Sequence, residues 1–300
     1  DLALEAREMA SGKWGEEIPG VELETEKDKG ITVTRIHVLN EVGKRSIGKI
    51  PGHYITLEVP GLRQKDTDLQ HRVAIRFAKE FESFLQRVGL DENAKVLIIG
   101  LGNHSVTPDS LGPLVVSNVM VTRHFFEMMS GEMGPGYRPV SAVAPGVLGT
   151  TGIETSEIVQ GIVDKSHPDF VIAIDALASK ALERVNTTIQ IADSGINPGS
   201  GIGNKRMGLT KETLGVPVIA VGVPTVVYAS TIVNNSFELV LKHFRQQTNN
   251  TEYLFGALEK MSENERLSLV KEVLDPMGHD LLVTPKEIDE FIEDIANIIA

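Results

Sequence analysis

The feature that most constrains the fold is a short apolar run, Val96 to Ile99, which ends in a glycine turn. A continuous apolar run is typical of a strand buried on both faces of a parallel sheet. The apolar segment Leu114 to Met129 follows and is long enough for a helix. Strand, glycine turn and helix make the first half of a βαβ unit, where ligands bind beyond the carboxyl ends of the strands. Asp109, in the connecting loop, is therefore placed where chemistry usually happens.

The glycine turn at Gly100 and Gly102 does not complete a nucleotide-binding motif. A dinucleotide fingerprint would need a third glycine where this chain has Ser105, and a P-loop would need Lys followed by Ser or Thr. A nucleotide-binding enzyme is therefore disfavoured. Two interpretations of Asp109 stay open on this stretch: a reactive carboxylate, or a cap that accepts free N–H groups at the start of the next helix.

Asp175 repeats this pattern, because it follows a second apolar run, Phe170 to Ile174, and is expected to end that strand. A helical crossover over residues 154–166 would make the two strands parallel neighbours and bring both aspartates to one edge of a sheet. Two carboxylates in one site do not both ionise readily, so one keeps a proton and the pair can act as acid and base. Alternatively, Asp175 is only the polar end of a strand or a cap for residues 176–182.

The rest of the chain alternates strand and helix patterns, which predicts a single α/β domain over residues 1–300. Residues 1–94 are expected to add strands and a helix to the core, residues 95–247 to form the core, and residues 251–300 to form C-terminal helices. The sequence from Thr284 to Glu287 is typical of a helix start. Strands are expected at 31–38, 54–59, 140–143, 187–192 and 216–221, and helices at 65–88, 154–166 and 231–247.

Composition excludes several classes of function. Hydrophobic content of 41% with 23% charged residues is that of a globular protein, and no apolar run reaches the length of ~20 residues that crosses a bilayer. The chain has no cysteine, which excludes disulfides and thiolate nucleophiles and suits a reducing cytoplasm. A net charge of −12 opposes binding to nucleic acid. We therefore expect a cytoplasmic protein with neither nucleic acid nor membrane as a partner.

A glycine-rich loop over residues 193–206 is a candidate for binding substrate. Gly199, Gly201 and Gly203 could offer N–H groups to an oxyanion or lie along an extended peptide, although such loops are commonly mobile surface segments. Asn103, beside the glycine turn, is grouped with them as a candidate. The histidines form no HExxH pair, so His104 and His279 are weak candidates for a metal site, and no metal or cofactor is expected.

Five blocks of the sequence occur together in this chain: GLGNHSVTPDSLGP, GTTGIETSEIV, DFVIAIDALAS, DSGINPGSGIGNKR and HDLLVTPKEID. Together they resemble the germination protease family of spore-forming Bacillus-type bacteria. The resemblance extends over residues 1–300 and is specific because the blocks occur together. A more distant similarity, through the pattern GxGNxxxxxDxxGP and the aspartate after the second strand, is to the hydrogenase-maturation endopeptidases, which have a phosphorylase-like α/β fold. That resemblance implies a mostly parallel central sheet flanked by helices.

The resemblance implies an endopeptidase that begins the degradation of small, acid-soluble spore proteins in the spore core at germination. It further implies a homotetramer made as a zymogen with an N-terminal propeptide, and a chain that begins at Asp1 fits removal of that propeptide. The catalytic residues that the family implies are Asp109 and Asp175, in an atypical aspartic mechanism. The ionised aspartate would activate water and the protonated one would donate to the leaving nitrogen, and sequence does not say which is which.

Two other functions remain open at this stage. One is a metal-dependent endopeptidase of the hydrogenase-maturation type that uses the same carboxylates. The other is a non-enzymatic module that holds a ligand or peptide in the same cleft.

Overall fold

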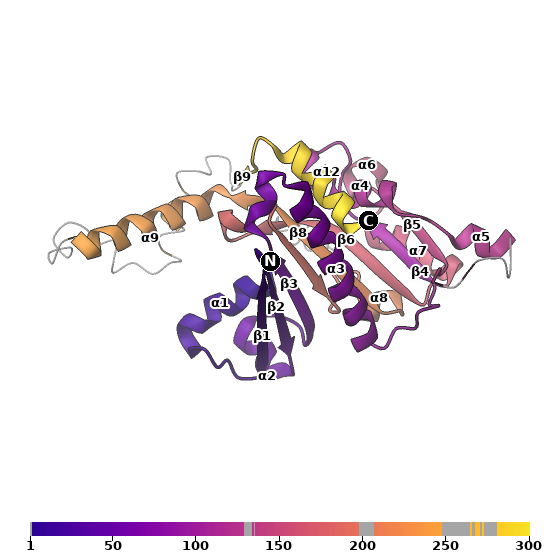
Figure 1. The fold of residues 1–300 in the computed structure, drawn as a ribbon, viewed down its shortest axis with the longest axis horizontal. Helices are drawn as coiled ribbons and strands as arrows, with labels where there is room; N and C mark the ends of the chain where they lie inside the picture. Colours follow the sequence, from indigo (N-terminus) through magenta and orange to yellow (C-terminus); the bar gives the residue numbers. More distant parts are fainter. Residues whose placement is uncertain are drawn as a thin grey trace.

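The protein, in a computed structural model, is an α/β fold built on one mixed sheet with helices on both faces (Figure 1). The structure describes residues 2–128, 134, 136–197, 207–247, 265, 268–270, 272 and 281–300. In spatial order the strands are β1 (Val21–Asp28), β2 (Ile31–Val38), β3 (Gly52–Glu58), β7 (Thr188–Ala192), β8 (Val218–Tyr228), β6 (Phe170–Ser179), β4 (Val96–Gly100) and β5 (Val140–Val143), with β9 (Leu282–Val283) beside the end of β8.

The sheet has a parallel half and an antiparallel half. Strands β5, β4, β6 and β8 pair in parallel, and β7, β3, β2 and β1 continue the sheet with antiparallel pairings. The parallel half contains both apolar runs on which the sequence prediction depended. The expected α/β class, a central sheet flanked by helices with N-terminal strands added, is confirmed. The sheet is mixed rather than mostly parallel, because β7, within the expected core, pairs antiparallel with both β3 and β8.

Burial on both faces explains why β4 is apolar throughout. Val96 and Ile98 pack on the face covered by α3 (Thr67–Arg87), α4 (Leu111–Asn118) and α12 (Ile288–Ile299). Leu97 and Ile99 pack on the opposite face, against α7 (Thr155–Ser166) and α8 (Lys211–Leu214). Successive side chains of a strand point to opposite faces, so a strand between two helical layers needs apolar residues at every position.

The N-terminal helix α1 (Ala3–Trp14) packs with α2 (Glu41–Ile47) on the antiparallel half of the sheet. Its contact includes an ionic cluster around the buried Arg184, which donates to Glu8 Oε1 at 2.6 Å and to Glu58 Oε1 at 3.0 Å. Glu5, also buried, lies 3.9 Å from the same guanidinium group and accepts hydrogen bonds from Ser179 and Lys180. The cluster therefore joins α1 to strands β3 and β6.

The remaining described elements are shorter, apart from α9 (Ala229–Gln247), which leads away from the sheet (Figure 1). No helix in the described part of the chain has the length and apolar character needed to cross a bilayer. The other elements are α5 (Arg123–Met128), α6 (Leu148–Thr151) and the 3-10 turns η1 (Pro60–Gln64), η2 (Thr107–Asp109) and η3 (Leu182–Arg184).

Several boundaries differ from those that the sequence predicted. Strand β6 does not end at Asp175 but runs on to Ser179, because residues 175–179 pair with β8. The acidic segment Val21–Asp28 forms an edge strand, and its mostly exposed side chains explain why it carries no hydrophobic pattern. The helix expected at 114–129 is broken: α4 ends at Asn118 and α5 begins at Arg123.

The C-terminal region also differs in detail from the expected run of helices. Residues 282–283 form β9, and α12 begins at Ile288 rather than at Thr284. The hydroxyl of Thr284, expected to cap that helix, donates instead to the carbonyl of Thr225 at 2.8 Å. The helix start was therefore misplaced because its capping residue has a tertiary partner.

Candidate active site

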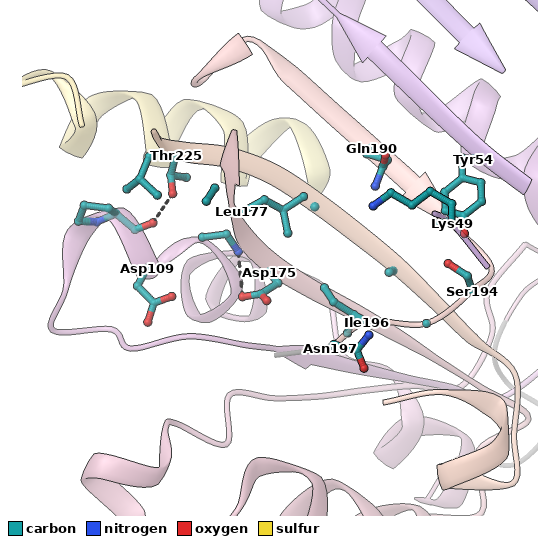
Figure 2. Close-up of a pocket in the computed structure, with 18 of the residues that line it drawn as sticks. Lys49, Tyr54, Asp109, Asp175, Leu177, Gln190, Ser194, Ile196, Asn197 and Thr225 are labelled. Atoms are coloured by element: carbon teal, nitrogen blue, oxygen red, sulfur yellow. Dashed lines mark hydrogen bonds between the residues drawn. The ribbon is translucent and has the colours of Figure 1, made fainter. Parts of the chain in front are cut away.

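A cavity of about 540 Å³ lies against β3, β7, β8 and β6, near the carboxyl ends of the parallel strands. Figure 2 shows Asp109 and Asp175 together at one end of it and Lys49, Tyr54 and Ser194 at the other. Both aspartates that the sequence singled out therefore line one cavity. The remainder of the wall is largely apolar or small, including Leu177, Ile196, Ala192, Ala220 and Gly222.

Asp175 lies within β6 and points into the cavity because of its place in the strand alternation. Val171 and Ala173 pack on the face covered by α7 and α8, and Asp175 has the same parity. It pairs with Gly222 on β8, which in turn pairs with Gln190 on β7. Because Gly222 has no side chain, space is left between Asp175 and Gln190, its partners on the two neighbouring strands. A Cβ at Gly222 would meet the side chain of Leu177.

Asp109 comes from a different element, the 3-10 turn η2 that lies between β4 and α4. Its Oδ2 accepts a hydrogen bond from the N–H of Asn103 at 2.8 Å. The residue at the N-cap position of α4 is Ser110, and its side chain makes no capping bond. Asp109 is therefore not the cap of the following helix, and its carboxylate is held instead by the glycine turn at the end of β4.

Glycines allow η2 and α4 to approach the end of β4 closely. A Cβ at Gly112, in the first turn of α4, would overlap the backbone of Leu101 and Gly100. Gly102 has a φ of +111°, in the region that favours glycine, and a Cβ there would overlap the carbonyl of Asp109. The glycine turn after β4, which does not match a nucleotide-binding motif, therefore allows the close packing that places Asp109 beside β6.

The surroundings of Asp175 favour its protonated form. The pKa of Asp175 is raised from its usual 3.8 to about 7, chiefly by burial and then by the negative charge of Asp109. The hydrogen bond from the N–H of Ala176 to Asp175 Oδ1, at 3.0 Å, acts in the opposite direction. At pH values below about 7, Asp175 therefore keeps its proton in a cavity that it shares with the carboxyl group of Asp109. Such a pair can supply an acid and a base to the same reaction.

The far end of the cavity contains polar residues that the sequence did not indicate. Burial, and secondarily the charge of Lys180, lowers the pKa of Lys49 to about 8. Tyr54 is buried and donates its hydroxyl proton to the carbonyl of Ile50 at 2.7 Å. Gln190 accepts a hydrogen bond from the N–H of Ala3 at 2.6 Å. These residues come from separate elements and belong to no motif, so nothing in the sequence connected them.

The other predicted site residues are placed as follows. The N–H of Asn103 holds Asp109, while its side-chain oxygen accepts from the N–H of Ser105 at 3.0 Å, and it is not among the described residues that line the cavity. Residues 194–197 line the cavity, but the glycines that follow them at 199, 201 and 203 lie outside the described residues, as does His279. His104 is exposed, and within the described ranges no three His, Cys, Asp or Glu side chains could hold a metal ion.

Comparisons with known proteins agree in pointing to one family. A family model described as germination protease matches residues 2–254 and 246–300. The germination protease of Bacillus cereus (strain AH187) is 49% identical over 333 aligned positions, which cover 100% of this chain and 90% of that protein. That of Bacillus mycoides (strain KBAB4) is 48% identical with the same coverage.

Among solved structures, the chain is similar to the NiFe hydrogenase maturation protease HycI of Thermococcus kodakarensis KOD1. The similarity has a TM-score of 0.32 at 16% sequence identity, and covers 69% of this chain and 90% of that one.

Proposed function

This chain belongs to the germination protease family, and we propose that Asp109 and Asp175 are the residues with which it cleaves peptide bonds. Family membership makes the chain a peptidase of spore germination, whose substrates are proteins in spores. The observation that supports the proposed residues is that two aspartates from different elements line one cavity, and that the buried one has a pKa near neutrality.

In the proposed mechanism the two aspartates have distinct tasks. Asp109, ionised and half-buried, accepts a proton from a water molecule as that water attacks the scissile carbonyl. Asp175, protonated, donates its proton to the leaving nitrogen when the tetrahedral intermediate collapses. This assignment follows from the environments: the more deeply buried carboxyl keeps the shared proton. The sequence had left the assignment open, and the burial of Asp175 favours this one.

The family resemblance further supports a specific setting for the enzyme. We propose that its substrates are the small, acid-soluble spore proteins and that it acts in the spore core as a homotetramer. We also propose that it is made as a zymogen and activated by loss of an N-terminal propeptide. Each of these points is separable from the identity of the catalytic pair.

The experiment that tests the proposed pair is cleavage of a purified small, acid-soluble spore protein by the activated full-length chain. We expect Asp109→Asn and Asp175→Asn each to lose most of the activity, by about 10³-fold or more, because each removes a proton-transfer group. A matched control is Asp164→Asn, since Asp164 is exposed on α7 and bonds only to Gln160 among the contacts described for it. That control should cleave at the wild-type rate.

Two further readouts distinguish this mechanism from others. Cleavage should decline as pH rises through about 7, where Asp175 loses the proton that it must donate. Activity should also persist in excess chelator. Loss of activity with chelator, restored by one divalent metal, would favour the metal-dependent alternative, and full activity of Asp175→Asn would remove that residue from catalysis.

A further inference from the structure

A β-bulge in β8 contacts both of the elements that carry the aspartates, β6 and η2. The pairing of β6 with β8 shifts at this point: Leu177 pairs with Pro224, but Ala178 pairs with Val226. Thr225 is therefore the extra residue, and only 1% of its surface is exposed. A bulge redirects a side chain out of the regular alternation, and bulges are common beside active sites. The direction of the Thr225 side chain is thus set by the bulge.

The hydroxyl of Thr225 is directed at the turn that carries Asp109. It donates to the carbonyl of Pro108, the residue before Asp109, at 2.7 Å (Figure 2). The backbone around the bulge is fixed in turn, because Thr284 Oγ1 donates to the carbonyl of Thr225 at 2.8 Å. The N–H of Asn186 donates to the carbonyl of Pro224 at 2.7 Å. Hydrogen bonds from Thr284 and Asn186 therefore fix the backbone of the bulge, and the Thr225 hydroxyl in turn fixes η2.

The hydrogen bond from Thr225 to Pro108 links the two elements that carry the aspartates, β6 and η2, through β8. Strand β8 pairs directly with β6, which carries Asp175, and the Thr225 hydroxyl connects β8 to η2, which carries Asp109. The bond from the N–H of Asn103 to Asp109 Oδ2 holds the carboxylate to the glycine turn after β4, whereas the Thr225 bond holds the backbone of η2 to β8. From this arrangement we infer that Thr225 is a positioning residue, which sets where Asp109 stands relative to Asp175. The inference rests on the proposed role of the two aspartates.

Loss of this bond should affect the chemical step more than binding of the substrate. A displacement of about 1 Å in a reacting group can lower the rate by about 10²-fold. We therefore expect Thr225→Val, which puts a methyl group against the Pro108 carbonyl, to lower kcat by about 10- to 100-fold with little change in KM. If Asp109 also moves away from Asp175, the electrostatic repulsion between the two carboxylates weakens and the pKa of Asp175 falls. The loss of activity at high pH should then begin at a lower pH.

The test compares variants of the activated full-length chain on a small, acid-soluble spore protein. Thr225→Ser keeps the hydroxyl and should retain nearly wild-type kcat and pH dependence. Thr188→Val is the control, because Thr188 is also buried in the sheet but its hydroxyl has no hydrogen-bond partner among the described residues. Unchanged kcat and pH profile in Thr225→Val would overturn the inference, as would a Thr225→Ser variant that is equally slow. If Thr225→Val does not fold, Thr225→Ala carries the same expectations.

A second readout separates this inference from the proposed mechanism. Carbon-13 NMR of aspartate-labelled protein follows the titration of Asp175 whether or not the chain cleaves its substrate. If Asp175→Asn keeps full activity, the proposed mechanism fails, while a lower pKa of Asp175 in Thr225→Val would still support the positioning role. An identical titration of Asp175 in wild type and Thr225→Val would contradict that role.

Discussion

Asp175 occupies a position in the middle of a strand, where aspartate is normally disfavoured. Its side chain is 8% exposed, and it shares the cavity with a second carboxylate. Both conditions oppose ionisation, so the residue is costly to the fold at neutral pH. A stability cost of this kind is typical of functional sites, where activity and stability conflict.

We expect Asp175→Asn to stabilise the protein at pH 8 while it abolishes cleavage. The pKa of this acid is about 7 in the folded chain and near 3.8 when unfolded, so ionisation lowers stability as pH rises from about 4 to 7. The penalty is absent below pH 4 and complete above pH 7, where a shift of about three units corresponds to about 4 kcal/mol. Asparagine avoids that penalty and should raise the free energy of unfolding by about 2–4 kcal/mol at pH 8.

Chemical denaturation of wild type and Asp175→Asn at pH 4 and pH 8 measures this effect. The difference in unfolding free energy should be large at pH 8 and small at pH 4. An equal difference at the two pH values would show that Asp175 does not carry the expected titration.

At the scale of elements, the contact of α4 with β4 decides where Asp109 lies. Gly112→Ala should destabilise the fold by about 1–3 kcal/mol, because the new Cβ overlaps the backbone of Leu101 and Gly100. Helix propensity alone would predict a gain of about 1 kcal/mol from the same change. Displacement of η2 should also lower cleavage by about 10²-fold.

Gly161→Ala is the matched control for this substitution. Gly161 lies within α7, and a Cβ there would meet nothing within 4 Å. The free energy of unfolding of Gly161→Ala should rise by about 0.5–1 kcal/mol, and the variant should keep full activity. Thermal unfolding and cleavage assays of the two variants test the difference, and a Gly112→Ala variant as stable and active as Gly161→Ala would contradict this packing.

The same elements show how far the sequence could predict the site. Two apolar runs, each followed by an aspartate, predicted both carboxylates and their common edge, because the βαβ rule links strand order to position. The extension of β6 past Asp175 was missed, since it depends on pairing with β8 rather than on local pattern. Likewise, the strand expected at 216–221 was too short at its end, because β8 continues through the bulge at Thr225 to Tyr228.

The other end of the cavity could not be predicted for a related reason. Lys49, in the loop after α2, and Tyr54, on β3, meet Gln190 because β3 pairs with β7 in the antiparallel half of the sheet. None of these residues has a motif or spacing that signals a site. Tertiary contacts of this kind follow from the whole fold and not from any segment of the sequence.

At the scale of the whole molecule, the ionic cluster around the buried Arg184 attaches the N-terminal helix to the sheet. Arg184→Met should lower stability by about 2–4 kcal/mol, because it removes a buried guanidinium group that pairs with Glu8 and Glu58 and lies 3.9 Å from the buried Glu5. Activity should fall with it, since α1 begins at Ala3, whose N–H donates to Gln190 in the cavity wall.

Lys44→Met provides the comparison for this variant. Lys44 and Glu41 form an exposed ion pair at 3.1 Å, and such pairs contribute about 0–1 kcal/mol. Denaturant unfolding and limited proteolysis near the N-terminus measure both variants. Equal, small losses of stability in the two would show that the Arg184 cluster does not anchor α1.

The central claim is that Asp109 and Asp175 share one proton in one cavity, and the most direct measurement is the pKa of Asp175 itself. Infrared difference spectra of carbon-13 aspartate-labelled protein, with Asp175→Asn as the reference, report the protonated carboxyl as a function of pH. We expect the pKa of Asp175 to be about 7 in the wild type and to decrease in Asp109→Asn, while burial keeps it above its usual value of 3.8. A wild-type Asp175 that is fully ionised at pH 5, or a titration that Asp109→Asn leaves unchanged, would contradict the shared-proton mechanism.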